Sequence, residues 1–249
     1  MKAFFKTDQG RVRQNNEDNG GVFQNKDGHF LAIVADGMGG HLAGDIASEM
    51  TVRHLKDLWE QAEGLQTADQ AEEWLKAHIN QVNKLLFEHS KSNPECEGMG
   101  TTIEAIIATD RFTSVAHVGD SRSYILNESG FQQLTEDHTL VNELVRSGQI
   151  SKEDAEHHPR KNVILRALGT EQEIKIDFKT IMFEEGDFLL LCSDGLSNKV
   201  KEQEMIQILQ NEDILEEKAE TLIKIANDNG GEDNITLIIV AFDDENERG

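Results

Sequence analysis

The sequence predicts an α+β fold in which two packed β-sheets carry helices on both of their outer faces. Short apolar runs such as residues 31–35, 188–192 and 235–240 are bounded by Gly or polar residues, which is the pattern of buried strands. Each half of the chain also contains a pair of segments that are typical of helices. Sheets and helices must each bury an apolar face, so two stacked sheets with helices outside are the economical arrangement.

In the first half, strands are expected near residues 3–7, 21–24 and 30–35, followed by long helices at about 43–63 and 70–92. Apolar residues recur every three to four positions in the second helix and form a less regular face in the first. Four more strands are expected at 101–109, 113–118, 123–126 and 131–134, with a hairpin turn at 127–130.

In the second half, residues 137–148 are expected to form a helix, and the sequence from Ser151 to Asp154 resembles a capping box that opens a short one. Strands at 177–183 and 188–192, helices at 202–210 and 215–229, and a last strand at 234–242 complete the map. No Pro/Ser-rich linker divides the chain, and it has only two prolines. We therefore expect a single domain over residues 1–249.

The composition limits the possible partners. The formal net charge is −23, from 24 basic and 47 acidic residues, which disfavours nucleic acid and anionic membranes as partners. The longest apolar stretch, residues 237–242, is too short to span a bilayer, and the N-terminus lacks the apolar region of a signal peptide. We expect a soluble, cytoplasmic protein. If its substrate is a phosphate ester, local cations must reverse the repulsive field at the site.

The two cysteines give no sign of a disulfide framework or of a catalytic thiol. Cys192 lies within an apolar run, which favours a buried, inert side chain. Neither Cys96 nor Cys192 has an Arg six positions later, since Thr102 and Asn198 stand there. The signature of cysteine-dependent phosphatases is therefore absent.

Four carboxylates stand at the ends of predicted strands, namely Asp36, Asp120, Asp194 and Asp233. Taken alone, each is commonly a turn residue. If four such acids converge at the rim of a core, they repel one another unless a cation lies among them. Hard divalent ions with a preference for oxygen ligands suit such a group.

Two further segments suggest chemistry, although each also has a purely structural interpretation. The run from Asp36 to His41, Asp-Gly-Met-Gly-Gly-His, connects a strand directly to a helix, where it is either a capped turn or a ligand-binding loop. Arg13 shares a turn with Glu17 and Asp18, and a guanidinium suits a phosphate dianion, although a surface turn is the simpler alternative. The segments 118–122, 192–195 and 231–234 also read as turns, the first as a hairpin.

In combination, these segments resemble a known family. They appear in the order Arg13-x-x-Asn16-Glu17-Asp18, Asp36-Gly37-Met38-Gly39-Gly40-His41, Gly100-Thr101-Thr102, Val118-Gly119-Asp120-Ser121-Arg122, Ser193-Asp194-Gly195 and Asp233-Asn234-Ile235-Thr236. The set closely resembles the metal-dependent protein phosphatases of the 2C type, the PPM family, over roughly residues 7–242. The short chain and the Met-Gly-Gly-His sequence resemble the bacterial branch.

The resemblance implies two antiparallel sheets and two or three Mn²⁺ or Mg²⁺ ions. By its motifs, Asp36 would bridge two ions, Asp194 and Asp233 would complete the first metal site, and the Gly37 carbonyl would serve the second. Asp120, with Asp194, would bind a third. Glu17 and Asp18 would hold metal-bound waters, and Arg13 would bind the phosphate.

The resemblance also implies hydrolysis of phosphoserine and phosphothreonine in proteins, in opposition to a eukaryote-like Ser/Thr kinase. A metal-bridging water would attack phosphorus in line, without a phosphoenzyme. Nothing in the sequence points to oligomerisation, so a monomer is the default. Eukaryotic relatives place a His two residues after the bridging Asp, where Met38 stands here. His41 is the candidate to replace it as general acid, with a structural role at the helix start as the alternative.

A segment at about residues 136–161 matches the mobile flap of bacterial relatives. It contains His157, His158 and Arg160, which we expect to select substrates and to take no part in the chemistry. A haloacid-dehalogenase-like phosphatase would need a second Asp at position 38, and a nuclease would need a basic groove. The remaining rival is a non-catalytic PPM-fold binding module, which should have lost metal ligands, whereas every expected acid is present.

Overall fold

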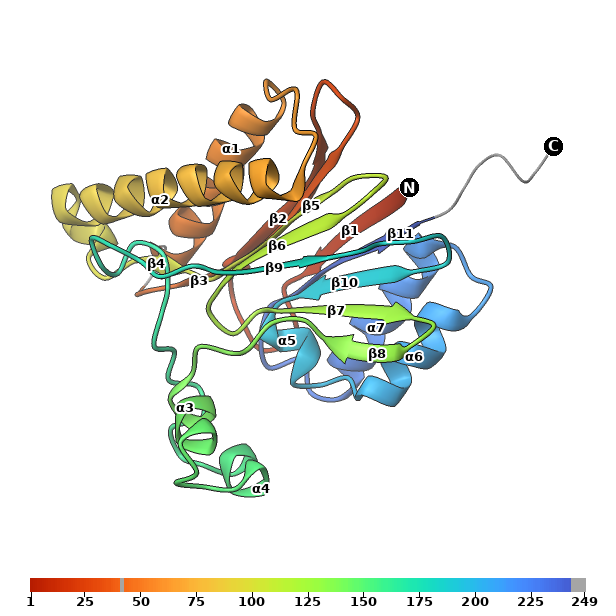
Figure 1. The fold of residues 1–249 in the computed structure, drawn as a ribbon. Helices are drawn as coiled ribbons and strands as arrows, with labels where there is room; N and C mark the ends of the chain where they lie inside the picture. The colour runs from red at the N-terminus through yellow and green to blue at the C-terminus, as the bar shows by residue number, and fades with distance from the viewer. Residues whose placement is uncertain (41–42, 243–249) are drawn as a thin grey trace.

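The computed structural model of the protein describes residues 1–40 and 43–242. Two antiparallel sheets lie face to face, with helices on both outer faces, as the sequence predicts (Figure 1). The first sheet has the order β1 (Lys2–Asp8), β11 (Ile235–Ala241), β10 (Phe188–Cys192), β7 (Arg122–Asn127) and β8 (Gly130–Gln133). The second has the order β2 (Asp18–Gln24), β3 (Phe30–Met38), β5 (Ile103–Ala108), β6 (Thr113–Val118) and β9 (Asp177–Ile181), with β4 (Gly100–Thr101) beside β3.

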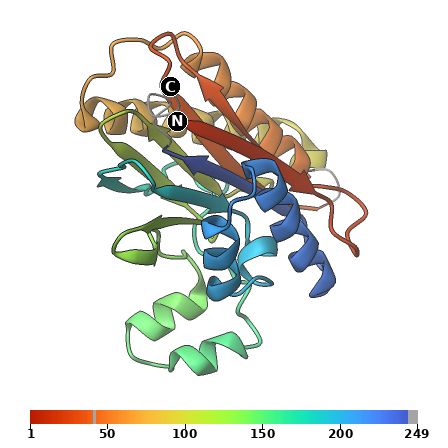
Figure 2. The same cartoon turned by 90° about the vertical axis from the view of Figure 1, so that its right-hand side faces the viewer.

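The helices form the two outer layers (Figure 2). The second sheet is covered by α1 (Ala43–Trp59) and α2 (Ala68–Ser92), and a capping box between Thr67 and Gln70 opens α2. The first sheet is covered by α5 (Asp194–Ser197), α6 (Glu202–Gln210) and α7 (Leu215–Asp228). A short 3₁₀ helix, η1 (Pro94–Cys96), follows α2. Within residues 1–40 and 43–242, no helix is both long and apolar enough to cross a membrane.

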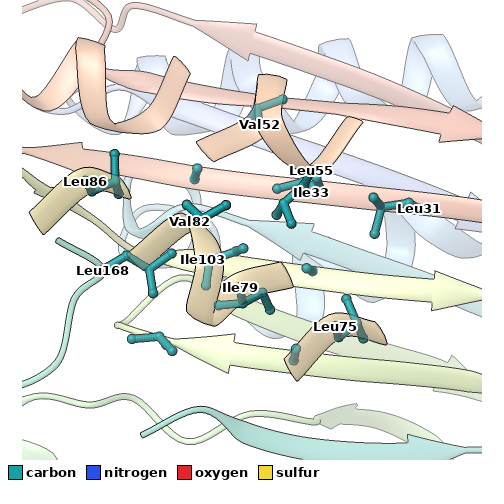
Figure 3. Packing of buried hydrophobic residues seen from close by; sticks show 14 of the residues in the cluster. Leu31, Ile33, Val52, Leu55, Leu75, Ile79, Val82, Leu86, Ile103 and Leu168 are labelled. Carbon is teal, nitrogen blue, oxygen red and sulfur yellow. The ribbon is translucent and has the colours of Figure 1, made fainter. Parts of the chain in front are cut away.

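The core has three apolar layers, because each central strand is buried on both faces. In β3, Leu31 and Ile33 pack against α1 and α2, as Figure 3 shows, whereas Ala32 and Val34 face the other sheet. Side chains alternate along a strand, so a strand buried on both sides reads as a continuous apolar run. Cys96 and Cys192 are both free and buried, and burial raises the pKa of the Cys192 thiol to about 12, which keeps it inert.

The structure differs from the sequence map in several places. Helix α1 ends at Trp59, whose buried indole donates a hydrogen bond to the Phe23 carbonyl over 3.1 Å. The short helix α5 and the 3₁₀ helix η1 were not expected. The segment 118–122 is not a hairpin, because β6 and β7 belong to different sheets and the chain crosses between the sheets there.

One segment lies outside the sandwich. Helices α3 (Leu140–Arg146) and α4 (Lys152–Glu156) project from one end of the molecule (Figures 1 and 2). Capping by Thr139 opens α3, and the expected capping box of Ser151 and Asp154 opens α4. Both helices lie within the predicted flap at 136–161.

Candidate functional site

The strand pairing explains why distant acids meet. In an antiparallel sheet, the end of one strand lies beside the start of its neighbour. The β2–β3 register sets Asp18 opposite Asp36, at the start of β2 and near the end of β3. In the other sheet, Asp194 follows the end of β10 and Asp233 precedes the start of the adjacent β11. Asp120 lies where the chain crosses from β6 to β7.

The inner face of the sandwich receives Asp18 and Asp36. Asp36 has the same parity along β3 as Ala32 and Val34, which pack between the sheets, and directly opposed residues share a face. The Ser193 hydroxyl, from the other sheet, donates to Asp18 Oδ2 over 2.7 Å. Asp18 Oδ1 and Asp120 Oδ1 are buried and have no hydrogen-bond partner among the described residues. Two carboxylate oxygens thus remain unsatisfied between the sheets.

Burial and mutual repulsion make these acids hard to ionise. Burial raises the pKa of Asp36 well above its usual value, and the charges of Asp18, Asp194, Asp120 and Asp233 raise it further. Burial, with smaller contributions from neighbouring acids, raises the pKa of Asp18 to about 7 and that of Asp120 to about 7. Burial and the nearby Asp233 charge raise the pKa of Asp194 to about 6. A divalent cation among them would offset both effects.

The donors fit a hard divalent cation in kind. All are oxygens, two are buried without a partner, and four belong to acids with raised pKa values. Yet no three Asp, Glu, His or Cys side chains of the described residues already stand in the geometry of a metal cage. The orphaned oxygens and the desolvated acids nevertheless favour a cation, because buried carboxylates repel one another unless a cation lies among them.

Backbone contacts fix Asp36 and Gly37. The Asp36 N–H donates to Thr102 Oγ1 over 3.0 Å, and the Thr102 hydroxyl shares a 2.8 Å hydrogen bond with Ser121, beside Asp120. A Cβ on Gly37 would lie 2.1 Å from the Gly44 carbonyl oxygen, so only glycine fits this approach between strand and helix.

The turn from Gln9 to Glu17 is held by Asn234. Its Oδ1 accepts from the Glu17 N–H over 2.8 Å, and its Nδ2 donates to the carbonyls of Gln9 and Asn15, both over 2.9 Å. Burial and nearby acids raise the pKa of Glu17, while Arg13 opposes the shift. Thr102, Ser193 and Asn234 stand inside the predicted motif segments, but the sequence alone indicated no role for them.

Known proteins match this chain across the segments that contain the acids. The family model described as "Protein phosphatase 2C" matches residues 8–235. The serine/threonine phosphatase stp of Listeria monocytogenes is 54% identical over 243 residues, covering 98% of this chain and 96% of that protein. The chain belongs to the protein phosphatase 2C family. It is therefore a metal-dependent serine/threonine protein phosphatase.

Solved structures of this phosphatase family share the whole fold. Serine/threonine phosphatase Stp1 from Staphylococcus aureus superposes with a TM-score of 0.92 at 40% identity, covering 98% of this chain and 95% of that one. The catalytic domain of the phosphatase PstP, solved with two manganese ions, has a TM-score of 0.85 at 34% identity and covers 98% of each chain. Dependence on a divalent metal agrees with the oxygen donors described above.

The other predicted site residues of this phosphatase differ in their contact with the acids. Arg13 Nη2 donates to Asp233 Oδ2 over 2.7 Å, and the Arg13 side chain is 48% exposed. His41 lies outside the described residues. His157 and Arg160 are exposed on the flap, where the Arg160 N–H donates to His158 Nδ1 over 3.1 Å.

The base of the flap is tied to the sandwich. Arg122, at the start of β7, donates from Nε and Nη2 to the two oxygens of Asp137 over 2.9 and 2.7 Å. This paired contact strongly raises the pKa of Arg122 against the cost of burial, so its charge is permanent. The start of the flap, at Asp137, is therefore held by an ion pair to Arg122, which lies two residues after Asp120 in the sequence.

Proposed function

We propose that this phosphatase releases phosphate from phosphoserine and phosphothreonine of proteins at the edge where Asp36, Asp120, Asp194 and Asp233 meet. The observation that carries the proposal is the pair of orphaned oxygens on Asp18 and Asp120, within a group of desolvated acids. Such a group has little structural value on its own, because unpaired buried carboxylates destabilise a fold. Its retention between the sheets is understandable if the acids hold cations.

We assign the metal-holding roles to the acids by their place in the family motifs. Asp36, Asp194 and Asp233 would hold the first of two or three Mn²⁺ or Mg²⁺ ions, Asp36 and the Gly37 carbonyl the second, and Asp120 with Asp194 the third. Bound ions supply a water that loses its proton near neutral pH, together with positive charge for the phosphate oxygens. Glu17 and Asp18 would orient metal-bound waters through their carboxylates.

Arg13 would bind the phosphate of the substrate. Its ion pair with Asp233 uses only one of five guanidinium N–H donors in a hydrogen bond, and the side chain faces solvent at the edge of the site. The group therefore keeps donors for phosphate oxygens beside the acids. A permanent positive charge here also opposes the field of a chain with net charge −23.

The remaining roles concern the leaving group and the partners. We keep His41 as a candidate general acid, to be tested by whether His41→Ala slows substrates with poor leaving groups. We propose that the flap selects among phosphoproteins. A cytoplasmic location, a monomeric state and an opposing eukaryote-like Ser/Thr kinase are further proposals, supported by the family resemblance.

The deciding experiment measures phosphate release from a phosphothreonine peptide with Mn²⁺ and with EDTA. Wild type should turn over only with Mn²⁺, and Asp36→Asn should lose about 100-fold to 1,000-fold, the scale of a lost electrostatic group in a catalytic centre. Asp110→Asn is the matched control, since the Asp110 side chain is 72% exposed in the loop between β5 and β6. A folded wild type without turnover under any metal would instead favour a non-catalytic binding module.

A further inference from the structure

A second polar cluster lies where the flap joins the sandwich, apart from the metal-holding acids. It contains Glu104 and His117 from β5 and β6, His138 at the flap base, Arg166 after the flap, and Asp177 at the start of β9. Glu104, His117 and His138 are buried, with exposures of 0, 2 and 8%. Buried polar side chains are costly unless each hydrogen bond is made, so this cluster calls for an explanation.

His138 is joined to the backbone beside Asp120 by two hydrogen bonds. The backbone N–H of His138 donates to the Gly119 carbonyl over 2.7 Å, and the Gly119 N–H donates to the ring nitrogen Nδ1 of His138 over 3.1 Å. On its other side Gly119 packs against Thr102, because a Cβ there would lie 2.5 Å from the Thr102 side chain. Gly119 has a φ of +119°, a conformation that favours glycine. The backbone that leads into Asp120 is thus enclosed between His138 and Thr102.

The same residue closes the base of the flap. The Leu165 N–H donates to the His138 carbonyl over 2.7 Å, and the Leu140 N–H donates to the Val163 carbonyl over 2.9 Å. These bonds join the chain entering the flap to the chain leaving it. A shift of His138 would therefore move both the flap base and the turn before Asp120.

Two of the three ring contacts of His138, those with Gly119 and Asp177, require the tautomer that carries its proton on Nε2. Since Nδ1 accepts from Gly119, the ring proton belongs on Nε2, which lies 3.0 Å from Asp177 Oδ2 and can donate to it. Arg166 Nη1 lies 2.9 Å from Nε2 and donates to Asp177 Oδ1 over 3.2 Å. Without Asp177, Arg166 would donate to Nε2, and the proton would move to Nδ1, where it would oppose the Gly119 N–H.

The surroundings keep this ring neutral. Burial, together with the charges of His117 and Arg166, lowers the pKa of His138 to about 4, although Asp177 opposes the shift. The His117 ring lies against it at a centroid distance of 4.6 Å and is itself fixed by Glu104 over 2.7 Å and by the Glu136 carbonyl over 3.0 Å. The ring thus has a fixed position as well as a fixed tautomer.

We propose that His138, held by Asp177 as its Nε2–H tautomer, is a positioning residue that sets the Asp120 turn and the flap base together. The proposal rests on the role proposed above for Asp120. If the hydrogen bond from the Gly119 N–H to His138 Nδ1 is lost, a higher Mn²⁺ concentration should be needed for the activation that depends on Asp120. The fold and the position of Asp36 should not change.

The first test compares His138→Asn with His138→Gln. The Asn oxygen can take the place of Nδ1 and accept from Gly119, whereas the Gln amide can replace Nε2 and cannot. We expect His138→Gln to speed hydrogen exchange of the Gly119 amide in the metal-free protein and to raise the Mn²⁺ concentration for half-maximal turnover, each roughly tenfold, as for one lost hydrogen bond. His138→Asn should remain within about threefold of wild type in both. Equal values for the two variants would overturn the proposal.

The second test uses Asp177, which is 42% exposed in its side chain and can be replaced without threatening the fold. Asp177→Ala should shift the His138 nitrogen signals in NMR from the Nε2–H to the Nδ1–H tautomer and speed Gly119 exchange, while Asp177→Asn, which keeps an acceptor, should not. An Nδ1–H tautomer in wild type, or unchanged exchange in Asp177→Ala, would refute the inference even if His138→Gln fails to fold. Both readouts are independent of turnover, so they separate it from a failure of the proposed function.

Discussion

Asp18 and Asp36 lie directly opposite each other in the β2–β3 register, with both carboxylates between the sheets and neither paired to a cation of the described residues. Two acids so placed destabilise the metal-free fold when they ionise. The sign follows from the pKa shift. Burial raises the pKa of Asp18 to about 7, from an ordinary value of 3.8, so the folded state keeps its proton where the unfolded state has lost it. Stability from this group is therefore lost as pH rises from about 4 to about 7.

Asp18→Asn should consequently stabilise the metal-free protein in a pH-dependent way. One pKa unit corresponds to about 1.4 kcal/mol, so the variant should gain about 2–4 kcal/mol in free energy of unfolding at pH 8 and no more than about 1 kcal/mol at pH 4.5. Urea unfolding in EDTA at both pH values measures this. An equal gain at both would contradict the assignment, and saturating Mn²⁺ should reduce or reverse the gain at pH 8.

The buried pair of Glu104 and His117 provides a second prediction. Burial raises the pKa of Glu104; burial would lower the pKa of His117, but Glu104 raises it overall. Ser123 Oγ donates to the second Glu104 oxygen over 2.6 Å, so the carboxylate is fully engaged. Removing one partner of such a pair costs about 3–5 kcal/mol. In urea unfolding, we expect Glu104→Ala to lose this much free energy of unfolding and Glu104→Gln to lose less. The exposed control Glu88→Ala should lose none. A loss below about 1 kcal/mol in Glu104→Ala would contradict this account.

Gly195 provides a prediction about the loss of stability when the site is crowded. A Cβ on Gly195 would lie 1.9 Å from the Asn234 carbonyl oxygen, so Gly195→Ala must separate α5 from the start of β11. Overpacking against backbone costs about 1–3 kcal/mol or more, and the shift would move Asp194 relative to Asp233. We expect lower stability together with a higher Mn²⁺ requirement, measured by urea unfolding and by metal titration of turnover. Gly40→Ala, which would meet nothing within 4 Å, is the control, and similar behaviour of both variants would show that crowding is not the cause.

If the flap selects substrates without taking part in the chemistry, changes in it should alter the preference among phosphopeptides but not the turnover of a small substrate. Replacing His157, His158 and Arg160 together by Ala changes side chains that are exposed or half-buried on a projecting segment. We expect turnover of a small aryl phosphate to stay within about twofold of wild type, since surface changes away from packing cost little. The ratio of kcat/KM between two phosphopeptides of different sequence should change several-fold. An unchanged ratio would mean that these residues do not select substrates.

The local sequence pattern located the acids at the ends of strands, but it did not reveal the residues that surround them. Asp36, Asp194 and Asp233 follow or precede continuous apolar runs, and a strand buried on both faces has no other local signature. The convergence of the acids depends on pairing of distant strands, such as β7 with β10, whose register sets Arg122 opposite Cys192 near Asp120 and Asp194, and the local pattern does not encode this pairing. The hairpin expected at 118–122 was wrong for the same reason, because the preference of β7 for β10 arises from contacts far along the chain.

The supporting residues were also beyond local reasoning. Asn234 holds Glu17 from 217 positions away, and Thr102 holds Asp36 from 66 positions away. His138 binds Gly119 and Asp177 through its ring, from 19 and 39 positions away. The one local signal was Glu104, a charged residue within the buried run of β5, which only a buried partner could accommodate.

The contact of Arg13 with Asp233 is compatible with two roles, phosphate binding and positioning of Asp233, and an experiment can distinguish them. If it binds phosphate, Arg13→Ala should raise KM for a phosphopeptide about 10-fold to 100-fold, because a charge-assisted hydrogen bond contributes about 1.5–3 kcal/mol, and the Mn²⁺ requirement should stay unchanged. Arg13→Lys should recover part of the loss, since it keeps the charge without the planar donors. If the 2.7 Å ion pair instead serves to position Asp233, the Mn²⁺ requirement should rise while KM at saturating metal stays constant. Titrating peptide at several fixed Mn²⁺ concentrations distinguishes the two, and the second outcome would reassign Arg13 from the substrate to the metal site.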